Sequence, residues 1–149
     1  MKKCITFIAF AVCLFLTTSS FAQIRKIPAE VTEGLKEKYP MASNVEWRDK
    51  IRGFTVTFDL NDEKYLAHFT NEGIWESTET EISEQDIPEE VKASFEKSKY
   101  ADWETGLIQK IELPESKIQY RVQVVKSELR KKNLYFSSEG KLLKDKMTI

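Results

Sequence analysis

Side chains able to do nucleophilic or metal chemistry are scarce in this sequence. The 149 residues include one histidine, His68, and two cysteines, Cys4 and Cys13. Both cysteines fall in an N-terminal segment that we expect to be removed, so the remaining chain lacks the Cys and paired His ligands that zinc sites use. A Ser–His–acid triad would need a nucleophile motif such as G-x-S-x-G, and the sequence has none. These residues predict no catalytic apparatus and no cofactor.

A run of carboxylates marks the middle of the chain. Calcium takes six to eight oxygen ligands, so carboxylates in this number could in principle surround one ion. The tight D-x-D-x-D-G spacing that brings oxygens to one calcium is absent, however. We therefore interpret the run as a solvated acidic edge, and nothing marks two of these groups as the facing pair of a hydrolase. The series comprises Glu76, Glu79, Glu81, Glu84, Asp86, Glu89 and Glu90.

Two further groups of residues could contact a partner. The basic cluster at residues 126–132 lies between two predicted strands and has the composition of a soluble hairpin tip, although its charge would also suit an acidic partner or a lipid headgroup. Trp47, Trp75 and Trp103 belong to a residue type that is enriched at interface hot spots. Tryptophans also close small cores, and we expect packing to be their main role here.

The first 22 residues have the layout of a secretory signal peptide. Lys2 and Lys3 form a basic start, an apolar stretch covers residues 5–16, and residues 20–22 form a small-x-small cleavage site. The apolar stretch is shorter than the roughly 20 residues that a membrane-spanning helix needs. We therefore expect a periplasmic or secreted protein that begins at Gln23 and has no membrane span. Loss of the two lysines makes the formal net charge of −1 more negative, which argues against a nucleic-acid partner.

The remaining sequence contains an internal repeat. Residues 27–31 (IPAEV) recur as residues 87–91 (IPEEV). In each copy a proline and a following glutamate favour a helix start, and apolar residues then recur every four positions. Polar and apolar residues alternate afterwards in residues 53–58 and 117–124, which is typical of antiparallel strands with one covered face. This pattern predicts an α+β fold: a tandem repeat of one helix packed on an antiparallel sheet of about four strands. The two copies would form either two sheets or one long one.

The first copy carries a recognisable set of residues. The set is Tyr39-Pro40-x-Ala42, Val45-x-Trp47, the alternating strand from Phe54 to Phe58, and Phe69-x-x-Glu72-Gly73-x-Trp75. These residues resemble the PepSY-like, β-lactamase-inhibitor-like proteins that Gram-negative bacteria export. The resemblance covers the mature chain in two copies, PepSY-like repeat 1 at residues 23–82 and repeat 2 at residues 83–149. It implies a tandem of helix-plus-four-stranded-sheet units, similar in plan to β-lactamase inhibitory protein, with a sheet face exposed to a partner protein.

Without a reactive group, the chain is predicted to be a non-enzymatic protein-binding or inhibitor-like module that meets another exported protein. Strand alternation places a set of mostly polar side chains on the exposed sheet face. The predicted partner-binding residues are Thr55, Thr57, Leu66, His68, Gln119, Arg121 and Gln123. An alternative hypothesis is a carrier of a small apolar ligand or lipid in the cleft between the two repeats, which would require an internal pocket.

Overall fold

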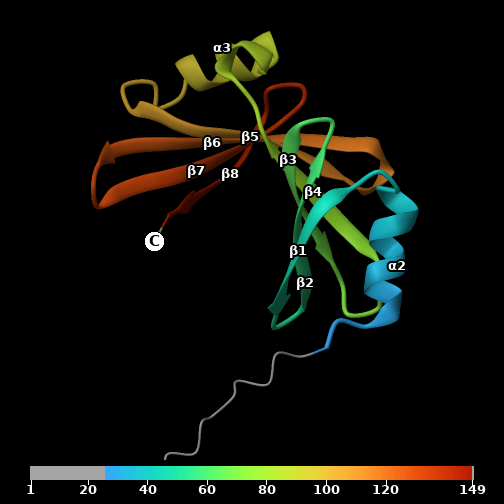
Figure 1. Ribbon diagram of the computed structural model, residues 1–149. Coiled ribbons are helices and arrows are strands. Elements are labelled where there is room, and N and C mark those ends of the chain that lie inside the picture. The colour runs from blue at the N-terminus through green and yellow to red at the C-terminus, as the bar shows by residue number, and fades with distance from the viewer. Residues whose placement is uncertain (1–25, 149) are drawn as a thin grey trace, which may run out of the picture.

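The computed structural model describes residues 26–148, and its strands form one antiparallel sheet (Figure 1). The eight strands follow one another across this sheet in chain order. The predicted signal peptide, residues 1–22, lies outside the described residues. The strands are β1 (Ser43–Lys50), β2 (Gly53–Leu60), β3 (Glu63–Phe69), β4 (Trp75–Glu81), β5 (Glu104–Leu113), β6 (Lys117–Ser127), β7 (Arg130–Ser137) and β8 (Leu142–Met147).

The predicted tandem repeat, in which each unit is one helix packed on a sheet of about four strands, is wrong, because strands β4 and β5 pair with each other and all eight strands form one sheet. Thr78 of β4 lies opposite Glu112 of β5, and Glu81 lies opposite Gln109. The sheet therefore continues across the predicted boundary between the repeats. A strand that ended a four-stranded sheet would leave a row of backbone N–H and C=O groups without partners. Pairing between β4 and β5 satisfies these groups on both strands.

Two α-helices, α2 (Ala29–Lys38) and α3 (Glu89–Glu96), each begin directly after a proline. Pro28 and Pro88 occupy the N-cap positions with φ of −62° and −57°. Proline is favourable at a helix start because its φ is already fixed and its missing N–H would have no partner there. The 3₁₀-helices η2 (Glu84–Asp86) and η3 (Pro114–Ser116) occupy connections between the larger elements.

Helix α2 packs one apolar side on the sheet. It buries Val31 and Leu35 in a cluster with side chains of β2 and β3. The middle of the helix comes unusually close to the turn between β3 and β4, because a Cβ added at Gly34 would lie only 2.4 Å from the carbonyl oxygen of Gly73. The buried members of this cluster are Val31, Leu35, Phe54, Val56, Phe58, Ala67 and Phe69.

Helix α3 covers the other end of the same sheet. Val91 is its buried residue and packs with alternate side chains of β6 and β7. Tyr100, from the connection that follows the helix, completes this second cluster. Its buried members are Ile87, Val91, Tyr100, Ile108, Tyr120, Val122, Val124, Leu134 and Phe136.

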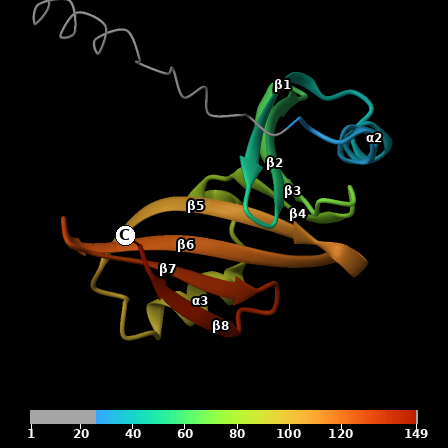
Figure 2. The same ribbon diagram turned by 90° about the horizontal axis from the view of Figure 1, so that it is seen from below.

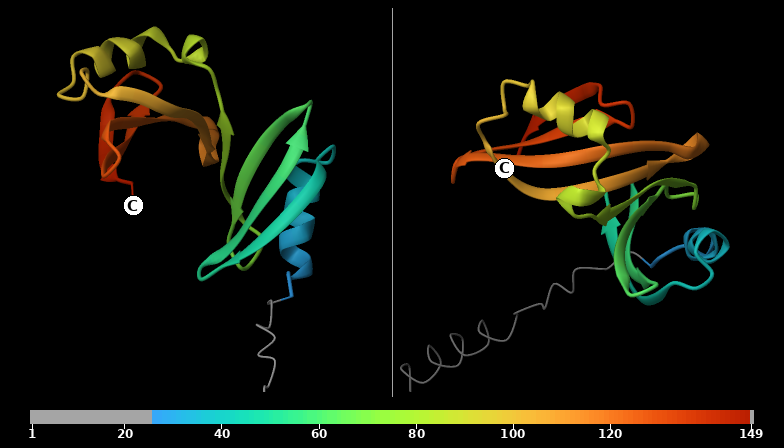
Figure 3. Two further views of the ribbon diagram at one scale, coloured as in Figure 1. Left: turned by 60° about the vertical axis from the view of Figure 1, so that its left-hand side comes forward. Right: turned by 90° about the horizontal axis from the view of Figure 1, so that it is seen from above.

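The sheet bends between its two ends, and both helices lie on the outer side of the bend (Figures 1 and 3). Seen from below, strands β5 to β8 lie in front of α3, so the sheet face turned away from the helices is uncovered there (Figure 2). We call this helix-free face of the sheet the open face. Because side chains alternate along a strand, residues that flank the buried core positions point to the open face.

Candidate partner-binding face

Strand register places all seven predicted partner-binding residues on the open face, in two groups. On β2 and β3, Thr55 lies opposite His68 and Thr57 lies opposite Leu66. The remaining three predicted residues, on β6, are Gln119, Arg121 and Gln123. They alternate with the buried side chains of Tyr120, Val122 and Val124. Strands β4 and β5 lie between the two groups. The two groups therefore contact each other only through side chains of these central strands.

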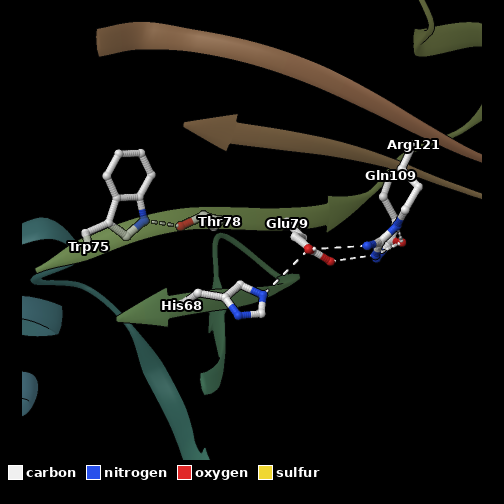
Figure 4. A network of polar contacts seen from close by, with 6 residues as sticks. All are labelled: His68, Trp75, Thr78, Glu79, Gln109 and Arg121. Carbon is white, nitrogen blue, oxygen red and sulfur yellow. Dashed lines mark hydrogen bonds and ion pairs between the residues drawn. The ribbon is translucent and has the colours of Figure 1, made fainter. Parts of the chain in front are cut away.

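Glu79 of β4 joins the two groups (Figure 4). Its Oε2 accepts a hydrogen bond of 2.6 Å from Nη2 of Arg121, and its Oε1 accepts a longer one of 3.4 Å from Nη1. On the other side, Nε2 of His68 lies 3.6 Å from Oε1 of Glu79. That separation is too long for a hydrogen bond, so the contact between the two side chains is a longer-range polar one.

Gln109 of β5 fixes the other side of the guanidinium group. Its Oε1 accepts a hydrogen bond of 2.8 Å from Nε of Arg121 and a second one from Nη2. Gln109 and Arg121 are direct partners in the pairing of β5 with β6. All three nitrogen atoms of this guanidinium group thus donate hydrogen bonds within the open face, four in all, and side chains of β4 and β5 hold its position.

The central pair is largely shielded from water. The side chain of Glu79 is 11% exposed and that of Arg121 is 19% exposed, whereas the side chain of His68 is 32% exposed. Burial opposes ionisation of Glu79, but contacts with His68 and Arg121 together outweigh it, so the pKa of this carboxyl group lies below its ordinary value. The open face therefore carries a fixed ion pair rather than two flexible surface charges.

The row of contacts continues to the far edge of the sheet. Tyr135 of β7 is the direct partner of Arg121, and Lys144 of β8 is the direct partner of Tyr135. The guanidinium carbon lies 6.0 Å from the centre of the tyrosine ring, and Nζ of Lys144 lies 4.3 Å from it. Both distances are within the range of a cation–π contact. Polar and aromatic contacts thus extend from β3 to β8.

Glu79, Gln109, Tyr135 and Lys144 were missed by the sequence analysis. Glu79 was assigned to a solvated acidic edge, yet its side chain is only 11% exposed. Gln109 and Tyr135 alternate with buried Ile108 and Leu134, so alternation alone could have placed them on the exposed face. What the sequence could not supply was the order of the strands, which decides that these side chains meet.

The three tryptophans pack against the cores, as expected. Trp47 lies 6.1 Å from Phe69 between ring centres, and Trp103 lies edge-on to Tyr100 at 5.3 Å. The indole nitrogen of Trp75 donates a 2.8 Å hydrogen bond to Oγ1 of Thr78 (Figure 4). All three are partly buried against the two clusters on the helix side of the sheet.

Two concave regions bear on the alternative hypothesis of an apolar-ligand carrier. A cavity of about 140 Å³ lies beneath α3, where its lining includes Val91, Phe95 and Val122. A groove of about 430 Å³ lies between the end of α2 and the hairpin of β5 and β6. Charged side chains form half of its lining, and they are Lys38, Glu112, Glu115 and Lys117. A groove with this lining is poorly suited to an apolar ligand, because burying charged groups against apolar surface is costly.

Within residues 26–148, no three His, Cys, Asp or Glu side chains come close enough together to hold a metal ion. Over the same residues, no helix combines the length and the apolar composition that crossing a bilayer requires.

Several solved structures have the same fold. A BLIP-like protein from Bacteroides fragilis superposes with a TM-score of 0.74 at 26% sequence identity, over 85% of this chain and 90% of that one. A DUF2874 family protein from Bacteroides ovatus superposes with a TM-score of 0.74 at 24% sequence identity, over 82% of this chain and 88% of that one. A protein from Bacteroides eggerthii that is assigned to the periplasm gives 0.73 at 22% identity, over 82% and 89%. That assignment agrees with the location predicted from the sequence.

Similarity at the level of sequence identifies the family. No curated protein matches the chain significantly. The family model of the beta-lactamase-inhibitor-like, PepSY-like proteins matches residues 54–144, which is more than half of the chain. The resemblance predicted from the sequence is confirmed, and the protein belongs to the PepSY-like, beta-lactamase-inhibitor-like family.

Proposed function

We propose that this protein is a non-enzymatic, periplasmic binding module and that its open face docks a partner protein. The observation that carries the proposal is the row in which His68, Glu79, Gln109 and Arg121 hold one another across four strands. These contacts fix long side chains before any partner arrives. A surface with fixed side chains loses less conformational entropy on binding than one whose side chains must first be ordered.

The composition of the open face also suits a protein partner. Arginine and tyrosine are enriched among residues that dominate binding energy at interfaces, and Arg121 and Tyr135 are neighbours at the centre of the β6–β7 region. Ile111, which lies opposite Glu79 and belongs to neither core cluster, is only 6% exposed. Because Ile111 is already buried in the unbound protein, it supports the polar side chains around it rather than offering apolar surface to a partner.

The family supports the same proposal. One solved structure with this fold is described as BLIP-like, and the family itself is described as beta-lactamase-inhibitor-like. Inhibitors of this kind act by covering another protein rather than by catalysis. We propose the same mode of action for this chain, with another exported protein as the partner.

The test is capture of a partner from periplasmic extract by the tagged mature protein. We expect a specific protein to be retained by the native chain and lost when Arg121→Glu reverses the charge at the centre of the open face. Thr57→Arg provides a second variant, because it adds bulk to the same face without removing any of the contacts described above. Lys36→Glu is the matched control, since this exposed lysine lies on α2, on the opposite side of the sheet.

Three outcomes decide the result. Loss of the captured protein in both face variants but not in the control supports the proposal. Retention of the same protein by both face variants would place its binding site elsewhere and contradict the proposal. Failure of the native chain to retain any specific protein would also count against it. Circular dichroism of each variant would separate lost binding from lost folding.

A further inference from the structure

Strand β8 is one of the two end strands of the sheet. Within residues 26–148 it pairs with β7 alone, and all six of its residues are exposed. An end strand presents a row of backbone N–H and C=O groups that can pair with an added strand. The opposite end strand, β1, carries charges of both signs on the open face, because Glu46 lies opposite Thr57 and Arg48 lies opposite Thr55.

The open face next to this edge carries positive charge only. Strand pairing places Lys144 and Lys146 of β8 on that face, opposite Tyr135 and Asn133 of β7. Lys131 of β7 adds a third cation, opposite Val125 of β6. No Asp or Glu occupies an open-face position on β6, β7 or β8 in the described part of the chain, which includes each of these strands in full. Further in on that face, Glu104 of β5 lies opposite Val125, the same residue of β6 that Lys131 lies opposite, and Glu79 of β4 is paired with Arg121.

The one acidic residue of β8 points to the other face and is engaged there. Asp145 accepts hydrogen bonds from the hydroxyl group of Tyr100 and from Nζ of Lys132, the latter at 3.1 Å. The hydrogen bond from Tyr100, followed by that from Lys132, holds the pKa of Asp145 below its ordinary value. Lys99 lies 3.8 Å away on the same side. Asp145 therefore anchors β8 to the helix side, and among residues 26–148 no carboxylate forms an ion pair with Lys144 or Lys146.

We infer that β8 is a docking edge for an acidic, extended segment of another protein, which adds to the sheet as a further strand. The added strand would place carboxylates two residues apart opposite Lys144 and Lys146, because side chains on one face of a strand recur every second residue. Main-chain hydrogen bonds along β8 would supply affinity, and the charge pairs would supply selectivity. This inference goes beyond the proposed function, since it uses the sheet edge and does not require Arg121.

The same lysines explain why two copies of this chain would not pair through β8. Edge-to-edge pairing of identical strands would bring lysines close to lysines, and like charges opposite each other are destabilising. Lysines on end strands commonly prevent aggregation in this way. In this protein they reject a basic or identical strand and admit an acidic one, which is how a repulsive element creates specificity.

The experiment uses a fluorescein-labelled peptide of about ten residues in which Glu alternates with Val or Thr. We expect the mature protein to bind it in fluorescence anisotropy at low ionic strength, with affinity that falls as salt is added. Hydrogen exchange should show that amide protons of β8 become protected in the complex. Reversing both charges, in the double variant Lys144→Glu and Lys146→Glu, should weaken binding by about tenfold or more, since each opposite-charge pair becomes a like-charge pair.

Two sets of controls isolate charge and spacing. A peptide of the same composition with all Glu residues in one block keeps the charge but loses the alternate spacing, and it should bind several-fold more weakly. The double variant Lys36→Glu and Lys97→Glu makes the same charge change on exposed residues of α2 and of the end of α3, and it should bind the alternating peptide as the native protein does.

The inference is overturned if the native protein does not bind the alternating peptide, or if both double variants weaken binding equally. It is also overturned if binding leaves the amide protons of β8 unprotected. The variant Arg121→Glu separates this inference from the proposed function, because it should lose the partner of the open face but keep the peptide. If the peptide fails to bind but capture of a partner still depends on Arg121, the docking edge is rejected and the proposed function is retained.

Discussion

Removing the guanidinium group of Arg121 should destabilise the protein through the carboxylate that it leaves behind. In Arg121→Met the side chain keeps its apolar length, but Glu79 loses both hydrogen bonds to the guanidinium group. The carboxylate then remains largely buried, with the imidazole ring of His68 at 3.6 Å as its remaining polar neighbour in the row. An enclosed carboxylate without adequate partners incurs the cost of its lost hydration. We therefore expect this single variant to be the most harmful change in the row.

The size of the effect follows from burial. Breaking a fully buried ion pair by removing one partner costs about 3–5 kcal/mol, whereas an exposed pair is worth less than about 1 kcal/mol. Glu79 and Arg121 are 11% and 19% exposed, so we place the cost of Arg121→Met at about 2–3 kcal/mol. Glu79→Gln should cost less, about 1–2 kcal/mol, because the amide is neutral and still accepts a hydrogen bond. The two changes together should cost about 1–2 kcal/mol less than their sum.

Urea unfolding followed by tryptophan fluorescence measures these free energies, and a double-mutant cycle extracts the coupling. Exposed residues of α2 provide the matched cycle, Lys36→Met with Glu37→Gln, for which we expect almost no coupling. If the coupling between Glu79 and Arg121 is below about 0.5 kcal/mol, the pair behaves as a surface contact and the reasoning fails.

The same pair predicts how stability depends on pH. Because the pKa of Glu79 is lowered in the folded state, its ionised form stabilises the protein at pH values above the ordinary 4.5 of an unfolded glutamate. That contribution is lost as the pH falls from 4.5 through the lower folded value. The native protein should therefore lose more stability on acidification than Glu79→Gln does. Equal losses in the two proteins would contradict the assignment.

Two further predictions concern the β1–β4 end of the sheet. Gly34→Ala should lower the free energy of unfolding, measured in urea, by about 1–2 kcal/mol, because the new Cβ would lie 2.4 Å from the carbonyl oxygen of Gly73. This clash should outweigh the preference of Ala for helices. The control is Glu33→Ala at an exposed position of the same helix, which should change the free energy of unfolding little. Tyr65 donates a 2.8 Å hydrogen bond to Glu63, and this bond is the main reason why the pKa of Tyr65 is raised to about 12. In Glu63→Gln, an absorbance titration should show the pKa of Tyr65 fall toward its ordinary value of 10.0. An unchanged titration in that variant would show that another group holds the tyrosine proton.

The amino-acid sequence determines the faces of individual strands. Alternation in residues 117–124 separates Arg121 from the buried Val122, and the strand β6 has this arrangement. Prolines and glutamates likewise locate the starts of α2 and α3. These features are local, because a side chain's direction along a strand and the cost of starting a helix depend on a few neighbouring residues.

The order of the strands is decided only by the tertiary structure. Backbone N–H and C=O groups are the same on every strand, so alternation in β4 and β5 does not reveal that these two strands pair. The error in the predicted fold, a tandem repeat of four-stranded sheets, arose at this point. Glu79 and Arg121 are 42 residues apart in the chain. Their ion pair exists because pairing of β4, β5 and β6 brings both side chains to one face of a single sheet.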